Sequence, residues 1–280
     1  TNSSSVEIDR IAPVIAPVRM YSDNASTTLA MPGDTVYVRL TTNETLSADT
    51  MSSIASGTTT TFTFSGTNTI IYSYVMQQSD PEGYVAFSWQ ATDTANNLVV
   101  VSAVTTGTAV YFDKTSSVVT SVRTSAASAR YTDDDSDPTN SDVIPITVNF
   151  DEAVYVSTGT PTLELETGDT DRTAIYASGA GTTALTFMYT VEDGDLTSPL
   201  NYTTTTALNA NGAVLTDVYG NSANLALPTT TSTASLNGVS LLQIDAENPS
   251  LTITANSHNV TGTQFAVTGY TVPIGVYGSE

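Results

Sequence analysis

Hydrophobic and polar residues alternate along much of this chain with a period of two, which is typical of β-strands that bury one face. The clearest run places apolar residues at every second position from Ile144 to Phe150, with Pro145, Thr147 and Asn149 between them. Similar alternation occurs at Val36, Val38 and Leu40, at Val85, Phe87 and Trp89, and at Leu185, Phe187, Tyr189 and Val191. Each of these segments is predicted to be a strand with one buried face.

Turn signals separate the alternating segments. They lie at Pro32-Gly33-Asp34, Asp80-Pro81-Glu82-Gly83, Ser178-Gly179-Ala180-Gly181, Asp193-Gly194-Asp195 and Asn211-Gly212, and these residue types favour tight turns. Thr and Ser are abundant and no helical stripe exceeds a turn or two, which is a strand-and-turn composition. The sequence therefore predicts an all-β fold, and 280 residues suit two β-sandwiches of ~100 residues each.

A recurring Asp predicts where the modules begin. An Asp followed shortly by a hydrophobic segment occurs at Asp9, Asp113 and Asp245. The first two open long β-rich stretches, which predicts modules at residues 9–112 and 113–244 after an N-terminal extension at residues 1–8. Only residues 245–280 follow the third, too few for a sandwich of ~7 strands. We expect a partial sheet there that other segments or another protomer complete.

Several motifs carry a family resemblance. They are Gly33-Asp34-Thr35-Val36, Gly159-Thr160-Pro161-Thr162-Leu163, Tyr176-Ala177-Ser178-Gly179, Gly194-Asp195 and Asp217-Val218-Tyr219-Gly220-Asn221. Together they resemble the Ig-like repeats of large bacterial surface proteins and adhesins. The resemblance implies tandem Ig-like β-sandwiches on a cell surface, and such repeats serve as spacers, binders and polymer units alike.

Charge and composition exclude several classes of partner. The chain has 7 Lys and Arg against 28 Asp and Glu, a net charge of −21, so it offers no basic patch to nucleic acid or anionic lipid. No apolar run approaches the ~18 residues of a membrane span. The absence of Cys fits a bacterial or archaeal surface protein, and we read the TNSSS start as that of an exported chain with an extracellular location. The acidic residues favour a solvated coat over a cation-binding role.

Catalysis is not expected. His258 is the only histidine, it lies in a predicted turn, and without Cys no Cys-His pair can form. No pair of carboxylates stands out for glycoside hydrolysis. We therefore predict that the chain is not an enzyme.

The densest acidic run offers one candidate metal site. Asp133, Asp134, Asp135 and Asp137 begin a run that ends at Asp142. Packed oxygen ligands in a loop suit Ca²⁺, although the run lacks the Gly and the closing Glu of an EF-hand. A solvated loop is the stronger interpretation, and the only cofactor considered is Ca²⁺. Glu192, Asp193 and Asp195 are interpreted as a plain turn.

Sites of modification are also considered. Asn-x-Ser/Thr sequons stand at Asn2, Asn24, Asn43, Asn201 and Asn259, and whether they carry glycans stays open because Asn, Ser and Thr are frequent in this chain. Lys114 is the only lysine, and no sorting motif is present. Sortase-type covalent polymerisation is therefore not expected.

The N-terminal segment leads to the functional hypothesis. Val6 and Ile8 alternate with polar residues ahead of the first full module, and an incomplete last module needs a strand. Donation of this segment to another protomer satisfies both, as in pilus subunits that assemble by donor-strand exchange, which the chain resembles in this respect. We expect a structural subunit of an extracellular, pilus-like helical fibril whose partners are copies of itself. The alternative is an Ig-like adhesin fragment that binds carbohydrate or Ca²⁺; an accessory region of a secreted glycosidase ranks well below both.

Overall fold

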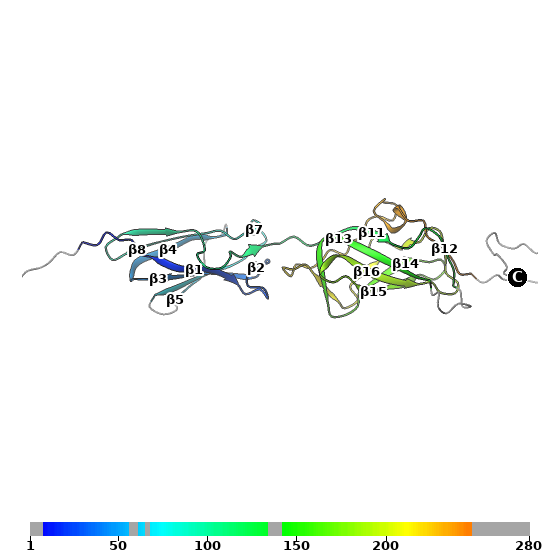
Figure 1. Ribbon diagram of the computed structural model, residues 1–280, viewed down its shortest axis with the longest axis horizontal. Helices are drawn as coiled ribbons and strands as arrows, with labels where there is room; N and C mark the ends of the chain where they lie inside the picture. The colour runs from blue at the N-terminus through cyan, green and yellow to red at the C-terminus, as the bar shows by residue number, and fades with distance from the viewer. Residues whose placement is uncertain (1–7, 56–60, 65–67, 134–141, 248–280) are drawn as a thin grey trace, which may run out of the picture. The chain divides into compact units, whose positions relative to one another are not determined.

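The computed structural model describes residues 8–55, 61–64, 68–133 and 142–247, and Figure 1 shows the strands in this part of the chain. Apart from one short 3₁₀ helix at Leu236–Gly238, every regular element described is a β-strand. The all-β prediction is confirmed. The chain divides into two compact units, and the first takes in Thr1–Val118, Glu152–Ser157 and Val214–Asn224.

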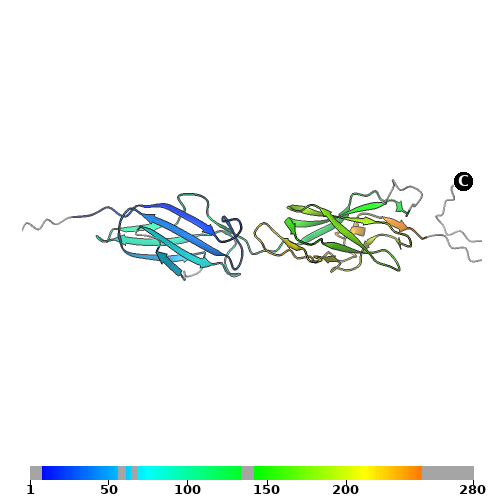
Figure 2. The same cartoon turned by 90° about the horizontal axis from the view of Figure 1, so that it is seen from below.

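The first unit contains two antiparallel sheets. One has the strand order β1-β3-β6-β5, with β1 at Ile15–Ser22, β3 at Thr35–Thr42, β6 at Thr69–Val75 and β5 at Thr61–Phe64. The other has the order β4-β8-β9, with β4 at Leu46–Ile54, β8 at Phe87–Asp93 and β9 at Leu98–Val101. In Figure 1 the two sheets form separate layers, and Figure 2 shows the blue β1 and β3 side by side within theirs.

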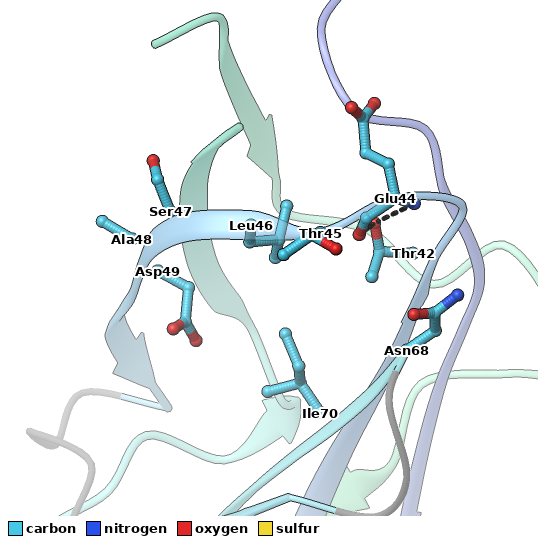
Figure 3. A pocket seen from close by; sticks show the side chains of 9 residues that line it. All are labelled: Thr42, Glu44, Thr45, Leu46, Ser47, Ala48, Asp49, Asn68 and Ile70. Carbon is cyan, nitrogen blue, oxygen red and sulfur yellow. Dashed lines mark hydrogen bonds between the residues drawn. The ribbon is translucent and has the colours of Figure 1, made fainter. Parts of the chain in front are cut away.

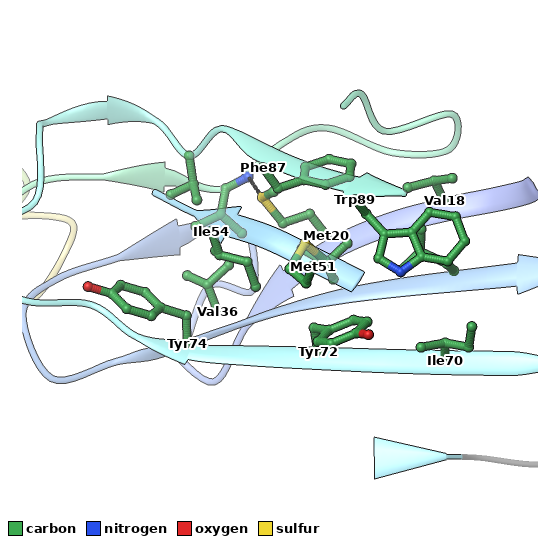
Figure 4. Packing of buried hydrophobic residues seen from close by; sticks show 14 of the residues in the cluster. Val18, Met20, Val36, Met51, Ile54, Ile70, Tyr72, Tyr74, Phe87 and Trp89 are labelled. Carbon is green, nitrogen blue, oxygen red and sulfur yellow. Dashed lines mark hydrogen bonds between the residues drawn. The ribbon is translucent and has the colours of Figure 1, made fainter. Parts of the chain in front are cut away.

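The core of this unit lies between the two sheets. Strands β3, β6 and β8 place every second side chain inward, as the alternation predicts, because successive side chains of a strand point to opposite faces. Trp89 is fully buried and lies among Met51, Ile70 and Tyr72 (Figure 4). Side chains of this kind contribute ~1.5–3 kcal/mol each when they are buried.

A small third sheet closes the first unit. Strand β10, at Tyr111–Phe112, pairs in parallel with β2, at Leu29–Ala30, and antiparallel with β7, at Gly83–Tyr84. Phe112 and Ala30 are fully buried in it. The residue that follows β10 is Asp113, one of the three residues predicted to begin a module.

The second unit contains most of one large sheet. Its strand order is β11-β13-β16-β15-β14-β18, with β19 beside β14 and β20 beside β13. The bounds are Val119–Thr124 for β11, Val143–Ser157 for β13, Thr182–Thr190 for β16, Arg172–Ser178 for β15, Thr162–Glu166 for β14, Asn201–Tyr202 for β18, Leu208–Asn209 for β19 and Val214–Thr216 for β20. The last residues of β13, Glu152–Ser157, and all of β20 belong to the first compact unit.

Alternation builds the core of the second unit too. Ile144, Ile146, Val148 and Phe150 of β13 are buried, as predicted. The second unit also has a small three-stranded sheet. In it, β21, at Gln243–Asp245, pairs in parallel with β12, at Arg130–Tyr131, and antiparallel with β17, at Leu196–Thr197. The predicted partial sheet after Asp245 falls largely on residues 248–280, outside the described part. The predicted module boundaries stay predictions.

Candidate metal sites

A loop closed by Asp93 provides the first candidate ligand. Asp93 ends β8, and its Oδ1 accepts hydrogen bonds from the N–H groups of Ala95 at 2.8 Å and Asn97 at 2.9 Å. The side-chain amide of Asn97 donates to Asp93 Oδ2 at 2.7 Å and to the carbonyl of Ile11 at 3.2 Å. The loop therefore fixes the buried Asp93 carboxylate and ties it to the chain that enters β1.

The loop from Asp217 to Asn221 repeats this arrangement. Asp217 Oδ1 accepts from the N–H of Tyr219 at 2.8 Å and of Asn221 at 3.0 Å, and the Asn221 amide donates to Asp217 Oδ2 at 2.9 Å. That amide also contacts a carbonyl of an earlier segment, Asp113 O, at 3.3 Å. The fourth residue is left-handed in both loops, with φ of 65° at Asn96 and 105° at Gly220, and Asn and Gly tolerate this conformation best.

Each loop brings three carboxylates together. Asp93 meets Asp9 and Glu44, and Asp217 meets Asp113 and Glu152, with one carboxylate oxygen of every member within 4.8 Å of the others. We call these two sets the carboxylate triads. Asp9 and Asp113 are held alike, because the Oδ1 of each accepts from the N–H two residues ahead at 2.9 Å. Both triads lie in the first unit.

The electrostatic environments of the triads differ. Burial would raise the pKa of Asp93, but the hydrogen bonds from Asn97 and Ala95 outweigh it and hold that pKa below its ordinary value. Burial raises the pKa of Asp113, and although the Thr115 N–H opposes this, the carboxylates of Asp217 and Glu82 raise it further. The second triad therefore concentrates negative charge that a cation would neutralise.

The ligand chemistry favours a hard divalent cation. Carboxylate and carbonyl oxygens bind Ca²⁺ at 2.3–2.6 Å in flexible geometry, with the remaining positions taken by further oxygens or water. Oxygens within 4.8 Å of one another can share one ion at such distances. Exposed acidic groups also gather without an ion, so the repetition of one arrangement at two places is the informative observation.

A pocket of about 270 Å³ lies beside the first triad and shares Glu44 with it. Its wall includes Thr42, Asn68 and Ile70 (Figure 3). In that view the Asp49 carboxylate points toward the pocket, while the Glu44 carboxylate points away from it. Asp49 accepts a hydrogen bond from Tyr72 Oη at 2.5 Å, so this carboxylate already has a partner.

The predicted calcium loop is only partly described. Asp134, Asp135 and Asp137 lie outside the described residues, whereas Asp133 lies within them. Asp142, at the end of the acidic run, accepts the Thr132 N–H on its Oδ2 at 3.0 Å, so it caps the backbone. The predicted plain turn at Glu192 to Asp195 contains a buried ion pair. The Asp195 side chain is fully buried, and its Oδ1 lies 2.7 Å from Arg172 Nε.

The predicted sequons lie in different environments. Asn2 and Asn259 lie outside the described residues, as do His258 and the predicted donor residue Val6. The amide nitrogens of Asn24 and Asn201 donate hydrogen bonds, to Asp34 Oδ2 at 2.7 Å and to the Thr230 carbonyl at 3.0 Å. Asn43 is exposed. Its Oδ1 accepts the Val14 N–H at 2.9 Å, and glycosylation stays a prediction.

Sequence reasoning missed four triad members: Glu44, Asp93, Glu152 and Asp217. A signal was present, because Asp93 to Asn97 reads DTANN, Asp217 to Asn221 reads DVYGN, and each Glu follows Asn43 or Asp151. The Asp residues predicted to begin the first two modules, Asp9 and Asp113, complete the triads. Asp245 instead pairs with Arg130 at 2.5 Å.

Comparisons with protein families, characterised proteins and solved structures found no match to this chain. Within the described residues, no helix has the length and apolar character needed to cross a membrane.

Proposed function

We propose that this chain is a structural subunit of an extracellular, pilus-like fibril, built from tandem Ig-like modules and assembled from copies of itself by strand donation. The observation that carries the proposal is that a small three-stranded sheet and a buried Tyr–Asp hydrogen bond occur in both units. Repeated modules that each form a self-contained core suit extended structural proteins, since each repeat adds length at similar stability.

The strand order of the first unit supports the Ig-like part. Its sheets contain four strands and three strands, in the orders β1-β3-β6-β5 and β4-β8-β9. In chain order these strands correspond to A-B-E-D and C-F-G, the arrangement of a constant-type Ig sandwich. One hydrophobic cluster draws buried residues from both sheets, as a sandwich core does.

The closing strands support the repeat. Strands β10 and β21 each pair in parallel with a short early strand and antiparallel with a short strand that follows an acidic turn. Each is completed or followed by one of the predicted module-opening residues, Asp113 or Asp245. The same closure therefore precedes two of the three predicted junctions.

A buried hydrogen-bonded pair repeats as well. Tyr74 Oη donates to Asp80 Oδ1 at 3.2 Å, and Tyr189 Oη donates to Asp195 Oδ2 at 2.7 Å. In both cases the Asp lies six positions after the Tyr. It also accepts the N–H of the residue halfway between them, which is Gln77 in the first pair and Glu192 in the second. Similar polar contacts at matching positions are what descent from one module would leave.

The experiment that tests the proposal removes the predicted donor segment. Deleting residues 1–8, or changing Val6 and Ile8 to Asp, should abolish filaments seen by electron microscopy. Circular dichroism should show a folded monomer, because the cores of both units lie in other residues. Normal filaments from the deletion would refute strand donation, and an unfolded monomer would assign the segment to its own first module.

The carboxylate triads favour a second function, the binding of Ca²⁺ within these modules. A ligand that binds only the folded state stabilises it by about 2.7 kcal/mol at one hundred times its Kd, and extracellular Ca²⁺ modules have Kd values of ~10⁻⁴–10⁻³ M. Calcium should therefore raise the melting temperature of the chain above its value in chelator.

Matched variants locate the ion. Glu44→Gln and Glu152→Gln remove one triad charge each and should reduce the calcium-dependent shift, whereas Asp171→Asn, at an exposed site outside the triads, should leave it intact. Changing Asp133, Asp134, Asp135 and Asp137 to Asn tests the predicted loop. An unchanged shift in both Gln variants together with its loss in the loop variant would move the ion to the loop.

A further inference from the structure

Strand β9 leaves one edge of the first unit unprotected. In the described part of the chain, β9 pairs only with β8, in a continuous register from Trp89 with Val101 to Thr92 with Leu98. Two of the other edges are modified: the register of β4 shifts twice against β8, and Thr105 bonds the N–H and the carbonyl of Val18 on β1. Bulges and covering segments are common means of keeping a sheet edge from pairing with another chain.

Charge does not protect this edge either. No Asp, Glu, Lys or Arg occurs from Thr94 to Phe112, although the chain has 35 charged residues, 28 acidic and 7 basic. Charged side chains on an edge strand normally prevent edge-to-edge pairing. In so acidic a chain, an uncharged edge is a place where a second acidic copy meets little repulsion.

Both faces of β9 remain apolar and incompletely covered. Leu98 and Val100 point outward and are 57% and 60% exposed. Val99 and Val101 pack against the core yet are only partly buried, because the sheet ends at β9 with three strands. A further strand beside β9 would cover the inward pair and extend the sheet by backbone hydrogen bonds.

We propose that β9 is the acceptor edge for residues 5–8 of a second copy of this chain. The inference rests on the proposed strand donation and names the surface that receives the strand. Val6 and Ile8 alternate with Ser5, Glu7 and Asp9, so one face of the donor is apolar and can lie over Val99 and Val101. Ile8 is 69% exposed in the single chain. Four extended donor residues span ~13 Å at ~3.3 Å per residue, which matches the four residues of β9.

Disulfide trapping tests the pairing directly, because the chain has no cysteine of its own. Chains with Glu7→Cys are mixed with chains that carry Val100→Cys, on the matching outward face, and are oxidised mildly. Covalent heterodimers should form. The control is Val75→Cys, which is 44% exposed on β6 of the other sheet and should yield few.

Two variants of opposite charge at Val100 supply a second test. Val100→Glu places a carboxylate beside the acidic outer face of the donor and should weaken self-association about tenfold or more, because like charges in an interface are costly. Val100→Lys should associate more strongly than Val100→Glu, with a difference that shrinks at high salt. Sedimentation measures association, and circular dichroism should show both variants folded, since Val100 is exposed.

The outcomes separate this inference from the proposed function. If the wild-type chain polymerises but both Val100 variants polymerise equally well and trapping matches the Val75 control, the acceptor lies elsewhere and strand donation stands. If a chain carrying both Glu7→Cys and Val100→Cys closes on itself at high dilution while mixed chains do not react, the segment belongs to its own edge and the inference is wrong. If wild-type chains stay monomeric at every concentration, strand donation and its acceptor are both refuted.

Discussion

Asp195, the buried carboxylate in the acidic turn of the second unit, gives a quantitative prediction. Asp195 is fully buried and has three partners: Tyr189 Oη at 2.7 Å, the Glu192 N–H at 2.9 Å and Arg172 Nε at 2.7 Å. Each partner donates, so the two carboxylate oxygens of Asp195 accept three hydrogen bonds. Asp195→Asn replaces one acceptor oxygen by an amide that must face a donor.

The expected costs follow from the contacts. Tyr189→Phe removes one hydrogen bond to a charged acceptor, worth ~1.5–3 kcal/mol. Asp195→Asn breaks a buried ion pair, which costs ~3–5 kcal/mol, and we expect the lower end because the Arg172 side chain is 25% exposed. Glu192 also pairs with Arg172, at 2.7 Å, but its side chain is 59% exposed, so Glu192→Gln should cost at most ~1 kcal/mol.

Urea unfolding measures these differences. Far-UV circular dichroism follows the whole chain, while the fluorescence of Trp89, the only tryptophan, follows the first unit, in whose core it is fully buried. The variants should lower the urea concentration at the midpoint of the second unit's transition, followed by circular dichroism, and should leave the midpoint of the Trp89 fluorescence transition unchanged. The reasoning fails if Asp195→Asn costs no more than Glu192→Gln. A Trp89 transition that shifts equally would show that the units unfold together.

Three further predictions follow from the structure. Burial and Asp195 raise the pKa of Tyr189 above its ordinary 10.0, so the stability that Tyr189 contributes is complete below pH ~10 and is lost as the pH rises further. Tyr189→Phe should therefore make the stability measured by circular dichroism less dependent on pH in this alkaline range. Burial raises the pKa of Tyr202 to about 12, so a spectrophotometric titration should find that this tyrosine ionises late. Gly179→Ala should lower the melting temperature more than Gly194→Ala: both sites are left-handed, but a Cβ at Gly179 would overlap the Ala184 carbonyl, whereas one at Gly194 meets nothing within 4 Å. Because burial and neighbouring carboxylates raise the pKa of Asp113, protons should compete with Ca²⁺ there, so calorimetric affinity should fall as the solution is acidified, and less so in Asp113→Asn.

The strands were predictable because one local rule determines them. Alternation at Ile144 to Phe150 and at Val85 to Trp89 requires only that one face meet a core, and both segments bury the expected residues. The pairing of β10 with β2 was not predictable in this way. Its two residues are too short to show a period, and the pairing joins residues about eighty positions apart in the sequence.

The carboxylate triads were harder to predict for the same physical reason. Asp9, Glu44 and Asp93 come from three separate segments, and only folding brings their oxygens within 4.8 Å. The acidic run from Asp133 attracted the metal prediction because its members are adjacent in the sequence. Adjacency concentrates charge, but ligands for one ion need a common centre, which turns and neighbouring strands can provide from distant positions.

The acidic character of the chain has a structural role that composition alone does not reveal. Asp34, Asp93, Asp142, Asp195 and Asp217 each accept a backbone N–H from a turn or a strand end. These carboxylates contribute to the net charge of −21 and are tied to the backbone by charge-assisted hydrogen bonds. The repulsion that remains has to be offset by counterions, and ions that bind at defined carboxylates stabilise the folded chain more than a diffuse ionic atmosphere does. A chain whose turns are held by Asp side chains therefore gains from divalent cations, and Ca²⁺ should stabilise it more than Na⁺ at equal ionic strength.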